Sequence, residues 1–151
     1  MRDLKSLTEE DAVVIVDYVK DTVRRLEVKS VSVAVVDVRG NVLSAIRMDG
    51  ALPHTFDVAI CKGKTAALYE RDTVLFSHVE KGGEWVRGEA HDHRADDNRR
   101  LVSPFFCSWA GGVAVFSDGH GVVGGIGISG LHELDDHELG EKAVDHWELT
   151  Q

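Results

Sequence analysis

Glycines that interrupt a β-forming stretch, residues 113–130, constrain the fold of this chain more than any other feature. β-Branched residues flank the letters SDGHG, so the stretch predicts two strands joined by a tight turn. The second strand has four glycines within seven positions: Gly124, Gly125, Gly127 and Gly130. Because glycine weakens a strand interior, this density indicates that a helix, a second copy of the chain or a ligand packs closely against the backbone.

The composition bounds the class of protein. A length of 151 residues with 43% hydrophobic and 28% charged residues predicts a single domain, residues 1–151. The net charge of −9 argues against nucleic acid or an anionic membrane as the main partner, since both need a basic surface. Two cysteines imply no disulfide framework. With no signal peptide and no membrane-spanning run in the sequence, we expect a cytoplasmic protein.

Hydrophobic periodicity predicts helices at the start, middle and end of the chain, with strands joined by hairpins between them. The expected elements are a helix capped by Thr8 and ending near residue 26, strands at 31–36 and 42–48, a helix at 55–69, a short helix or irregular turn at 71–81, a solvated loop at 82–100, a strand at 102–109, the two strands of residues 113–130, and a helix at 134–149. No βαβ alternation supports a parallel sheet. The prediction is therefore an α+β domain with a five-stranded antiparallel sheet layered with helices.

Four segments together resemble a known family. They read LTEEDAVVIVD, VSVAVVDVRGNVLSAIRMDGA, DVAICKGKTAAL and VVGGIGISG, in that order. Aligned on these segments, the resemblance covers about two-thirds of the chain. The sequence is similar to the GlcG/HbpS-like family of small haem-binding or haem-associated proteins, related to the C-terminal domain of PduO-type proteins. The resemblance implies a five-stranded antiparallel sheet in a profilin-like arrangement, assembly into dimers or larger oligomers, and haem as a possible cofactor.

The segment between residues 82 and 110 departs from the family pattern, because it carries EAHDHRADDNRRLVSPFFCSW where many members have a short loop and a strand. Within it, His91 and His93 would point the same way on an extended backbone and could approach one divalent metal. A third ligand would come from elsewhere: Asp96, Asp97, His120 or His54. The alternatives are acid–base chemistry by these imidazoles and a plain solvated loop.

A second group of polar residues surrounds the start of the central helix: Arg47, Asp49, His54, Asp57 and Lys62. A strand end that leads into a helix N-terminus is suited to binding an anion, where backbone N–H groups and a cation can meet a carboxylate. The family resemblance places the letters RMDG and Lys62 near the presumed cleft. The alternative is an ion pair between Arg47 and Asp57 that ties the hairpin to the helix.

A third group combines arginines with aromatic residues: Arg99, Arg100, Phe105, Phe106 and Trp109. A guanidinium beside aromatic rings would suit a planar aromatic acid or a haem propionate, so Arg100 joins the candidate ligand-binding residues. Packing in a core or an interface is the other use of such aromatic side chains.

Other motifs indicate packing rather than chemistry. Residues 125–130 spell GxGxxG, but they lie within and at the end of a strand rather than between a strand and a helix. No GxSxG, P-loop, CxxC or HExxH motif is present in the sequence. Cys61 and Cys107 have no activating neighbour in the sequence, so we expect both to be small buried hydrophobic residues.

The sequence supports three hypotheses on function. The first is an accessory, carrier or sensor protein that binds a small planar or carboxylated ligand, with haem favoured by the resemblance and Arg47, Asp49, His54, Lys62 and Arg100 as ligand-binding residues. The second is an enzyme acting on a small carboxylic or aromatic acid by proton transfer, hydration or metal-assisted hydrolysis, with His91 and His93 as the acid–base or metal groups and Arg47, Lys62 or Arg100 holding the carboxylate. The third is a structural subunit without a ligand.

The apolar content also predicts self-association. Five aromatic residues join a sheet already rich in valine: Phe105, Phe106, Trp109, Phe116 and Trp147. Large exposed apolar patches on a monomer are uncommon, and homo-oligomers usually close around a two-fold axis. We expect a homodimer or a higher even-numbered oligomer, with residues 82–110 contributing to the contact and lining a shared cleft.

Overall fold

The computed structural model describes residues 4–88 and 103–151, and within them the chain forms an α+β domain. The elements follow in chain order: α1 (Glu9–Leu26), β1 (Ser32–Asp37), β2 (Val42–Arg47), α2 (His54–Leu68), the 3-10 helix η1 (Thr73–Phe76), β3 (His78–Lys81), β4 (Glu84–Arg87), β5 (Gly112–Ser117), β6 (Gly121–Ser129) and α4 (Glu133–Leu149). No helix among the described residues combines the length and the apolar character needed to cross a membrane.

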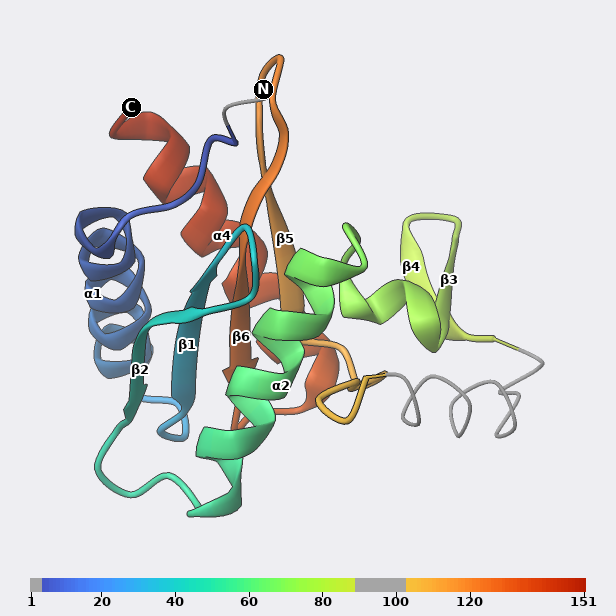
Figure 1. The fold of residues 1–151 in the computed structure, drawn as a ribbon. Coiled ribbons are helices and arrows are strands. Elements are labelled where there is room, and N and C mark those ends of the chain that lie inside the picture. Colours follow the sequence, from blue (N-terminus) through green and yellow to red (C-terminus); the bar gives the residue numbers. More distant parts are fainter. Residues whose placement is uncertain (1–3, 89–102) are drawn as a thin grey trace.

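Four strands form one antiparallel sheet in the order β2-β1-β6-β5. The long strand β6 lies between β1 and β5, so the first and last hairpins of the chain meet along it. Helix α2 covers one face of this sheet, while α1 and α4 lie side by side on the other (Figure 1). The glycine-rich strand is therefore central and covered on both faces.

The face under α2 is packed backbone against backbone. A Cβ at Gly127 would overlap the carbonyl oxygen of Ala59, and one at Gly125 would overlap that of Gly63, both on α2. Small residues on the helix allow this approach, because Ala59 and Ala66 are buried with no bulk to hold the layers apart. Of the three neighbours that the glycines predicted, the helix is the one that the structure shows at Gly125 and Gly127, so the GxGxxG letters mark packing.

The opposite face carries the large aliphatic core. Alternate residues of the strands, such as Val33 and Val35, pack there against α1 and α4. Trp147 of α4 is buried in the same cluster, and its indole N–H donates to Asp11 of α1 over 2.8 Å. This hydrogen bond links the two helices beside their apolar contact.

The start of α1 was predicted correctly. The Thr8 side chain accepts from the Asp11 backbone N–H, and the Asp11 carboxylate accepts from the Thr8 backbone N–H, which is a capping box. The helix ends at Leu26, followed by Glu27 in the left-handed region at φ 53°. The predicted strands of both hairpins and the helices at 55–69 and 134–149 are confirmed within one or two residues.

Within the residues that the structure describes, the main sheet has four strands rather than the five predicted. The expected strand at 102–109 is wrong in its described part, because Phe106 donates its N–H to the Ser103 carbonyl over 2.9 Å and closes a turn around Pro104. Proline has no N–H to give to a sheet, and the turn directs the chain away from extended geometry. Phe106 is buried in a cluster of aromatic rings with Tyr69 and Phe76 instead.

A separate two-stranded hairpin, β3–β4, was not predicted. It occupies part of the segments expected to be a short helix or turn and a solvated loop, although η1 does supply a single helical turn within 71–81. Gly82 and Gly83, at φ 60° and 80°, form its two-residue turn, which is the geometry that hairpins favour. The strands are four residues each and largely polar, so they lack the apolar alternation that identifies strands in a sequence.

Candidate functional site

A cleft opens at the end of the main sheet where β6 gives way to α4. Its volume is about 810 Å³, within the range that suits small-molecule ligands. Five parts of the chain line it: residues 29–30 before β1, residues 50–55 between β2 and the start of α2, Arg87 of β4, Trp109, and residues 129–133. Lys62 and Asp136 reach it from below. Helix N-termini of both α2 and α4 thus meet at one place.

Lys62 and Asp136 form a buried ion pair at the floor of the cleft. The Lys62 ammonium donates to the Asp136 carboxylate over 3.2 Å and to the Ile128 carbonyl of β6 over 2.8 Å. Their side chains are only 1% and 2% exposed. Gly111 makes room for the pair, because a Cβ there would lie 2.7 Å from the Lys62 nitrogen. The pair joins α2, α4 and the central strand beneath the cleft.

Burial governs the electrostatics of Asp136. Its second carboxylate oxygen accepts from the Leu131 N–H over 3.0 Å, and the Gly130 N–H also donates to the carboxyl group. Burial raises the pKa of Asp136 to about 6, although the Lys62 charge and these hydrogen bonds act in the opposite direction. Asp136 therefore titrates near neutral pH, which is a common property of carboxyl groups at functional sites.

The rim of the cleft carries exposed cations and an exposed aromatic ring. Trp109 is 62% exposed. Arg87 lies 3.4 Å from Glu133 with a side chain 69% exposed, and Lys29 is exposed across the cleft. Because Glu133 also accepts from the Ala110 N–H over 3.0 Å, this carboxylate holds the rim segments together.

Two histidines complete the rim. His54 begins α2 and is exposed. His132 is the N-cap of α4, where its Nδ1 accepts from the Leu134 N–H over 3.3 Å and leaves Nε2 for another partner. An imidazole that faces a cleft can ligate a metal or a haem iron, or exchange a proton with a bound molecule. The rim therefore offers cations, a flat apolar ring and imidazoles around a polar, fully paired floor.

The structure brings together some of the residues that the sequence singled out. His54 and Lys62 both line the cleft, while Arg47 and Asp49 do not belong to its lining. Arg47 donates to the Ala51 carbonyl over 2.8 Å and so orders the β2–α2 connection. No ion pair joins Arg47 to Asp57, both of which the structure describes.

The remaining predicted residues lie elsewhere. His91, His93 and Arg100 fall outside the described residues, as do Asp96, Asp97 and Arg99. His120 lies in the β5–β6 turn, at the opposite end of β6 from the cleft. Cys61 and Cys107 are half-buried, and burial raises the pKa of the Cys61 thiol.

Several lining residues were not predicted: Arg87, His132, Glu133 and Asp136. Asp136 belongs to an acidic helix start, where carboxylates usually interact with the helix dipole at the surface. Leu139 and Ala143 follow Asp136 by three and seven positions, and both are buried. This helical spacing is the sequence signal that places Asp136 on the buried face of the helix. The sequence marked Lys62 in a similar way, because it is a cation among the small residues of a helix that packs on the glycines of β6.

The fold and the site together define an α+β domain with a cleft at the end of its sheet. Comparison with known proteins identifies its family. The family model described as "Haem degrading protein HbpS-like" matches residues 7–145. The chain belongs to the HbpS-like family, which confirms the resemblance drawn from its sequence.

Individual relatives agree with this assignment. Protein GlcG of Escherichia coli (strain K12) is 31% identical over 100 residues, which cover 66% of this chain and 64% of GlcG. The match thus spans less than two-thirds of that relative. The crystal structure of a double mutant of Streptomyces reticuli HbpS is 28% identical with a TM-score of 0.74, covering 96% of this chain and 89% of HbpS. The crystal structure of a PduOC–haem complex has a TM-score of 0.75 at 24% identity, covering 93% and 94% of the two chains, and shares the fold.

Proposed function

We propose that this protein binds a small planar, carboxylated ligand, with haem favoured, in the cleft at the end of β6, and serves as an accessory, carrier or sensor protein. The observation that carries the proposal is the rim itself. An exposed tryptophan, two cationic side chains and two imidazoles surround a cleft with a volume of about 810 Å³. This combination suits a flat ring system with carboxylate substituents.

Each rim group has a role in this proposal. Trp109 offers its exposed face for stacking against the ligand ring. Arg87 and Lys29 lie at the opening and would pair with carboxylates such as the propionates of haem. Glu133 lies 3.4 Å from Arg87 and would help to position the guanidinium before a ligand arrives.

His54 and His132 are the candidate ligands for a haem iron. Both line the cleft and both are exposed. The Nδ1 of His132 accepts a backbone hydrogen bond, so Nε2 is the nitrogen left for the iron. When bound, haem would supply an iron centre whose properties depend on such an axial ligand.

The buried floor shapes the cleft in this proposal and does not bind the ligand directly. Lys62 already donates to Ile128 and Asp136 and is 1% exposed, so a ligand carboxylate would have to displace existing partners. The family membership supports haem as the ligand, since its model bears the description of a haem-degrading protein and a PduOC structure of the same fold is a haem complex.

A haemin titration tests the proposal. We expect a saturable shift of the Soret band with a Kd of about 1 µM. His54→Ala or His132→Ala should alter the band position or weaken binding at least about tenfold, because loss of an axial ligand removes a strong bond. His120→Ala is the matched control, since this histidine is exposed at the other end of β6 and should leave the titration unchanged. Featureless, non-saturating absorbance would refute haem as the ligand.

Proton transfer to a small acid in the same cleft is a second candidate function. The observation that favours it is Asp136, a carboxyl group with a pKa of about 6 at the floor. Incubating small carboxylic and aromatic acids with the protein in D₂O would reveal exchange at carbon by NMR. Exchange that survives in Asp136→Asn but disappears in a His91→Ala/His93→Ala variant would assign the chemistry to the histidine-bearing segment, and no exchange in the wild type would refute the activity.

Self-association is also proposed, with an even number of subunits. Of the five aromatic residues behind that prediction, Trp109 and Phe116 are 62% and 50% exposed, whereas Phe106 and Trp147 are buried within this chain. The exposed pair, together with Val79 and Val86 of the β3–β4 hairpin, leaves apolar surface for a second copy. Light scattering should give at least twice the 16.6 kDa chain mass, and a monomer at micromolar concentration would contradict the proposal.

A further inference from the structure

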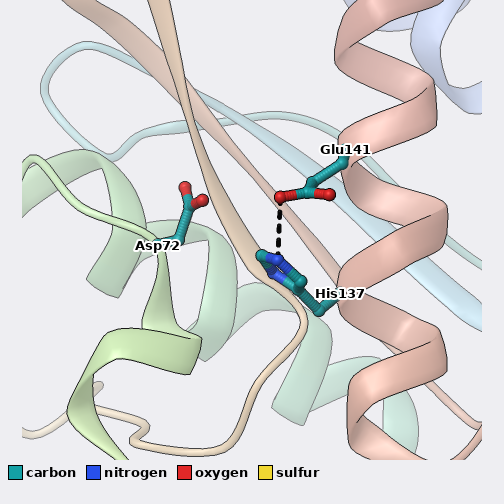
Figure 2. Close-up of side chains that lie close together, drawn as sticks. All are labelled: Asp72, His137 and Glu141. Carbon is teal, nitrogen blue, oxygen red and sulfur yellow. Dashed lines mark ion pairs between the residues drawn. The ribbon is translucent and has the colours of Figure 1, made fainter. Parts of the chain in front are cut away.

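A second polar cluster lies beside the edge strand β5, between the start of η1 and α4, and takes no part in the cleft. It consists of Asp72, which precedes η1, and His137 and Glu141, which are one turn apart on α4 (Figure 2). One potential ligand atom from each residue lies within 4.8 Å of the other two. Two segments that are distant in the sequence thus bring three metal-binding groups close to one point.

His137 is the unusual member of this cluster. It is 1% exposed, and neither ring nitrogen has a hydrogen-bond partner. Its Nε2 lies 2.9 Å from a Glu141 carboxylate oxygen, which is an ion-pair distance without hydrogen-bond geometry. Buried polar groups nearly always have a hydrogen bond, so a buried imidazole that has none and lies beside two carboxylates calls for a further partner.

The surroundings hold these groups in place. One oxygen of Asp72 accepts from the Ala114 N–H of β5 over 2.9 Å, which leaves the other oxygen for a ligand. Trp85 packs edge-on against the His137 ring, with centroids 5.5 Å apart, and closes one side of the site. The Glu141 side chain is 51% exposed, so it can rotate and provides an entry path from solvent.

We propose that Asp72, His137 and Glu141 bind one divalent cation of the zinc class. Two carboxylates and a neutral imidazole balance a charge of +2, and oxygen and nitrogen ligands of this kind bind Zn²⁺ at about 2.0–2.2 Å. Ligand atoms around such an ion lie at most about 4.4 Å apart, so a small rotation of Glu141 closes the site. The site is separate from the cleft residues and from His91 and His93, so it does not depend on the proposed haem function.

The experiment is calorimetric titration of the full chain with ZnCl₂ after removal of metals with a chelator. The wild type should bind one equivalent at the cluster with a micromolar Kd, and a hundredfold excess over Kd should raise Tm by about 5 °C. Glu141→Gln should weaken this binding at least about tenfold, since it removes one ligand charge. Because Glu141 is exposed, this variant should fold, and His137→Leu should abolish the same binding event.

Two control variants locate the metal. Glu138→Gln changes an exposed acid on the same helix that pairs with Lys142, and it should bind zinc like the wild type. A His91→Ala/His93→Ala variant should retain the equivalent bound by the cluster. A wild type that binds no Zn²⁺ would overturn the proposal. Binding unaffected by Glu141→Gln and His137→Leu, or lost only in the His91/His93 variant, would equally overturn it.

Discussion

Asp136 and His137 are adjacent in the sequence, and both are almost completely buried, yet their hydrogen bonding differs. Asp136 faces α2, where it pairs with Lys62 and accepts from the Leu131 N–H. His137 faces Asp72 and Trp85, and neither of its nitrogens has a hydrogen-bond partner. A buried group whose hydrogen bonds are all made stabilises the fold, whereas a buried group without a hydrogen bond indicates a place where a ligand can bind.

The difference has consequences for stability. Breaking a buried ion pair leaves an uncompensated charge, whereas removing an unpaired buried polar group can be neutral or favourable. Breaking the Lys62–Asp136 pair and removing the His137 imidazole should therefore have opposite effects, although Asp136 and His137 are neighbours in the first turns of one helix.

The largest effect is expected for Lys62→Met. This change removes the only described cation that pairs with the Asp136 carboxyl and should lower the free energy of unfolding by about 3–5 kcal/mol at neutral pH. Urea denaturation measures the loss, and ¹³C NMR should show a further rise in the pKa of Asp136. The double variant Lys62→Met/Asp136→Leu is the control, since it removes both charges and should recover much of the loss. A cost below about 1 kcal/mol for Lys62→Met would show that the pair is not energetically coupled.

The next effect concerns pH. The pKa of Asp136 is about 6 in the folded protein against an ordinary value of 3.8, so the folded state binds this proton more tightly than the unfolded state does. The contribution of Asp136 to stability is therefore complete below about pH 4 and is lost as the pH rises through 6, by about 3 kcal/mol. Subtracting the stability curve of Asp136→Asn from that of the wild type isolates this change. A ¹³C titration midpoint below 4 for the Asp136 carboxyl would contradict it.

The smallest effect is expected for His137→Leu without metal. Leucine fills a similar volume against Trp85 and removes two unpaired nitrogens, so the free energy of unfolding should change by less than about 1 kcal/mol or increase. Chemical denaturation in the presence of a chelator measures this. A loss comparable with that of Lys62→Met would show that His137 is held by its carboxylate neighbours alone, and the contrast between the two positions would disappear.

The sequence predicted most of the fold because its strongest patterns are local. The cap of α1, the two outer hairpins and the close packing implied by Gly125 and Gly127 all follow from residue type and spacing. The fifth strand was wrong because the apolar letters around Phe106 indicate burial without specifying backbone direction, and the turn at Pro104 places that ring in an aromatic cluster.

The site was less predictable because its residues come together only through the tertiary fold. Lys62 and His54 were identified from the central helix, but Asp136 and His137 belong to an acidic helix start that looks solvated in a sequence. The rotation of α4 about its axis decides that Asp136 contacts Lys62 and that His137 lies beside Asp72 and Glu141. A sequence does not specify this rotation. The β3–β4 hairpin, which brings Arg87 to the cleft, has too few apolar residues to be recognised.

The most direct test of the central claim is to locate the ligand on the protein. Ferric haem broadens the NMR signals of nearby amides through its unpaired electrons, and gallium protoporphyrin provides a diamagnetic reference. We predict broadening at Ser30, Thr55 and residues 129–133, with sharp signals retained in the β5–β6 turn around His120, at the far end of the sheet. Broadening centred on that turn, or none at saturating haem, would contradict the assignment of the cleft as the ligand site.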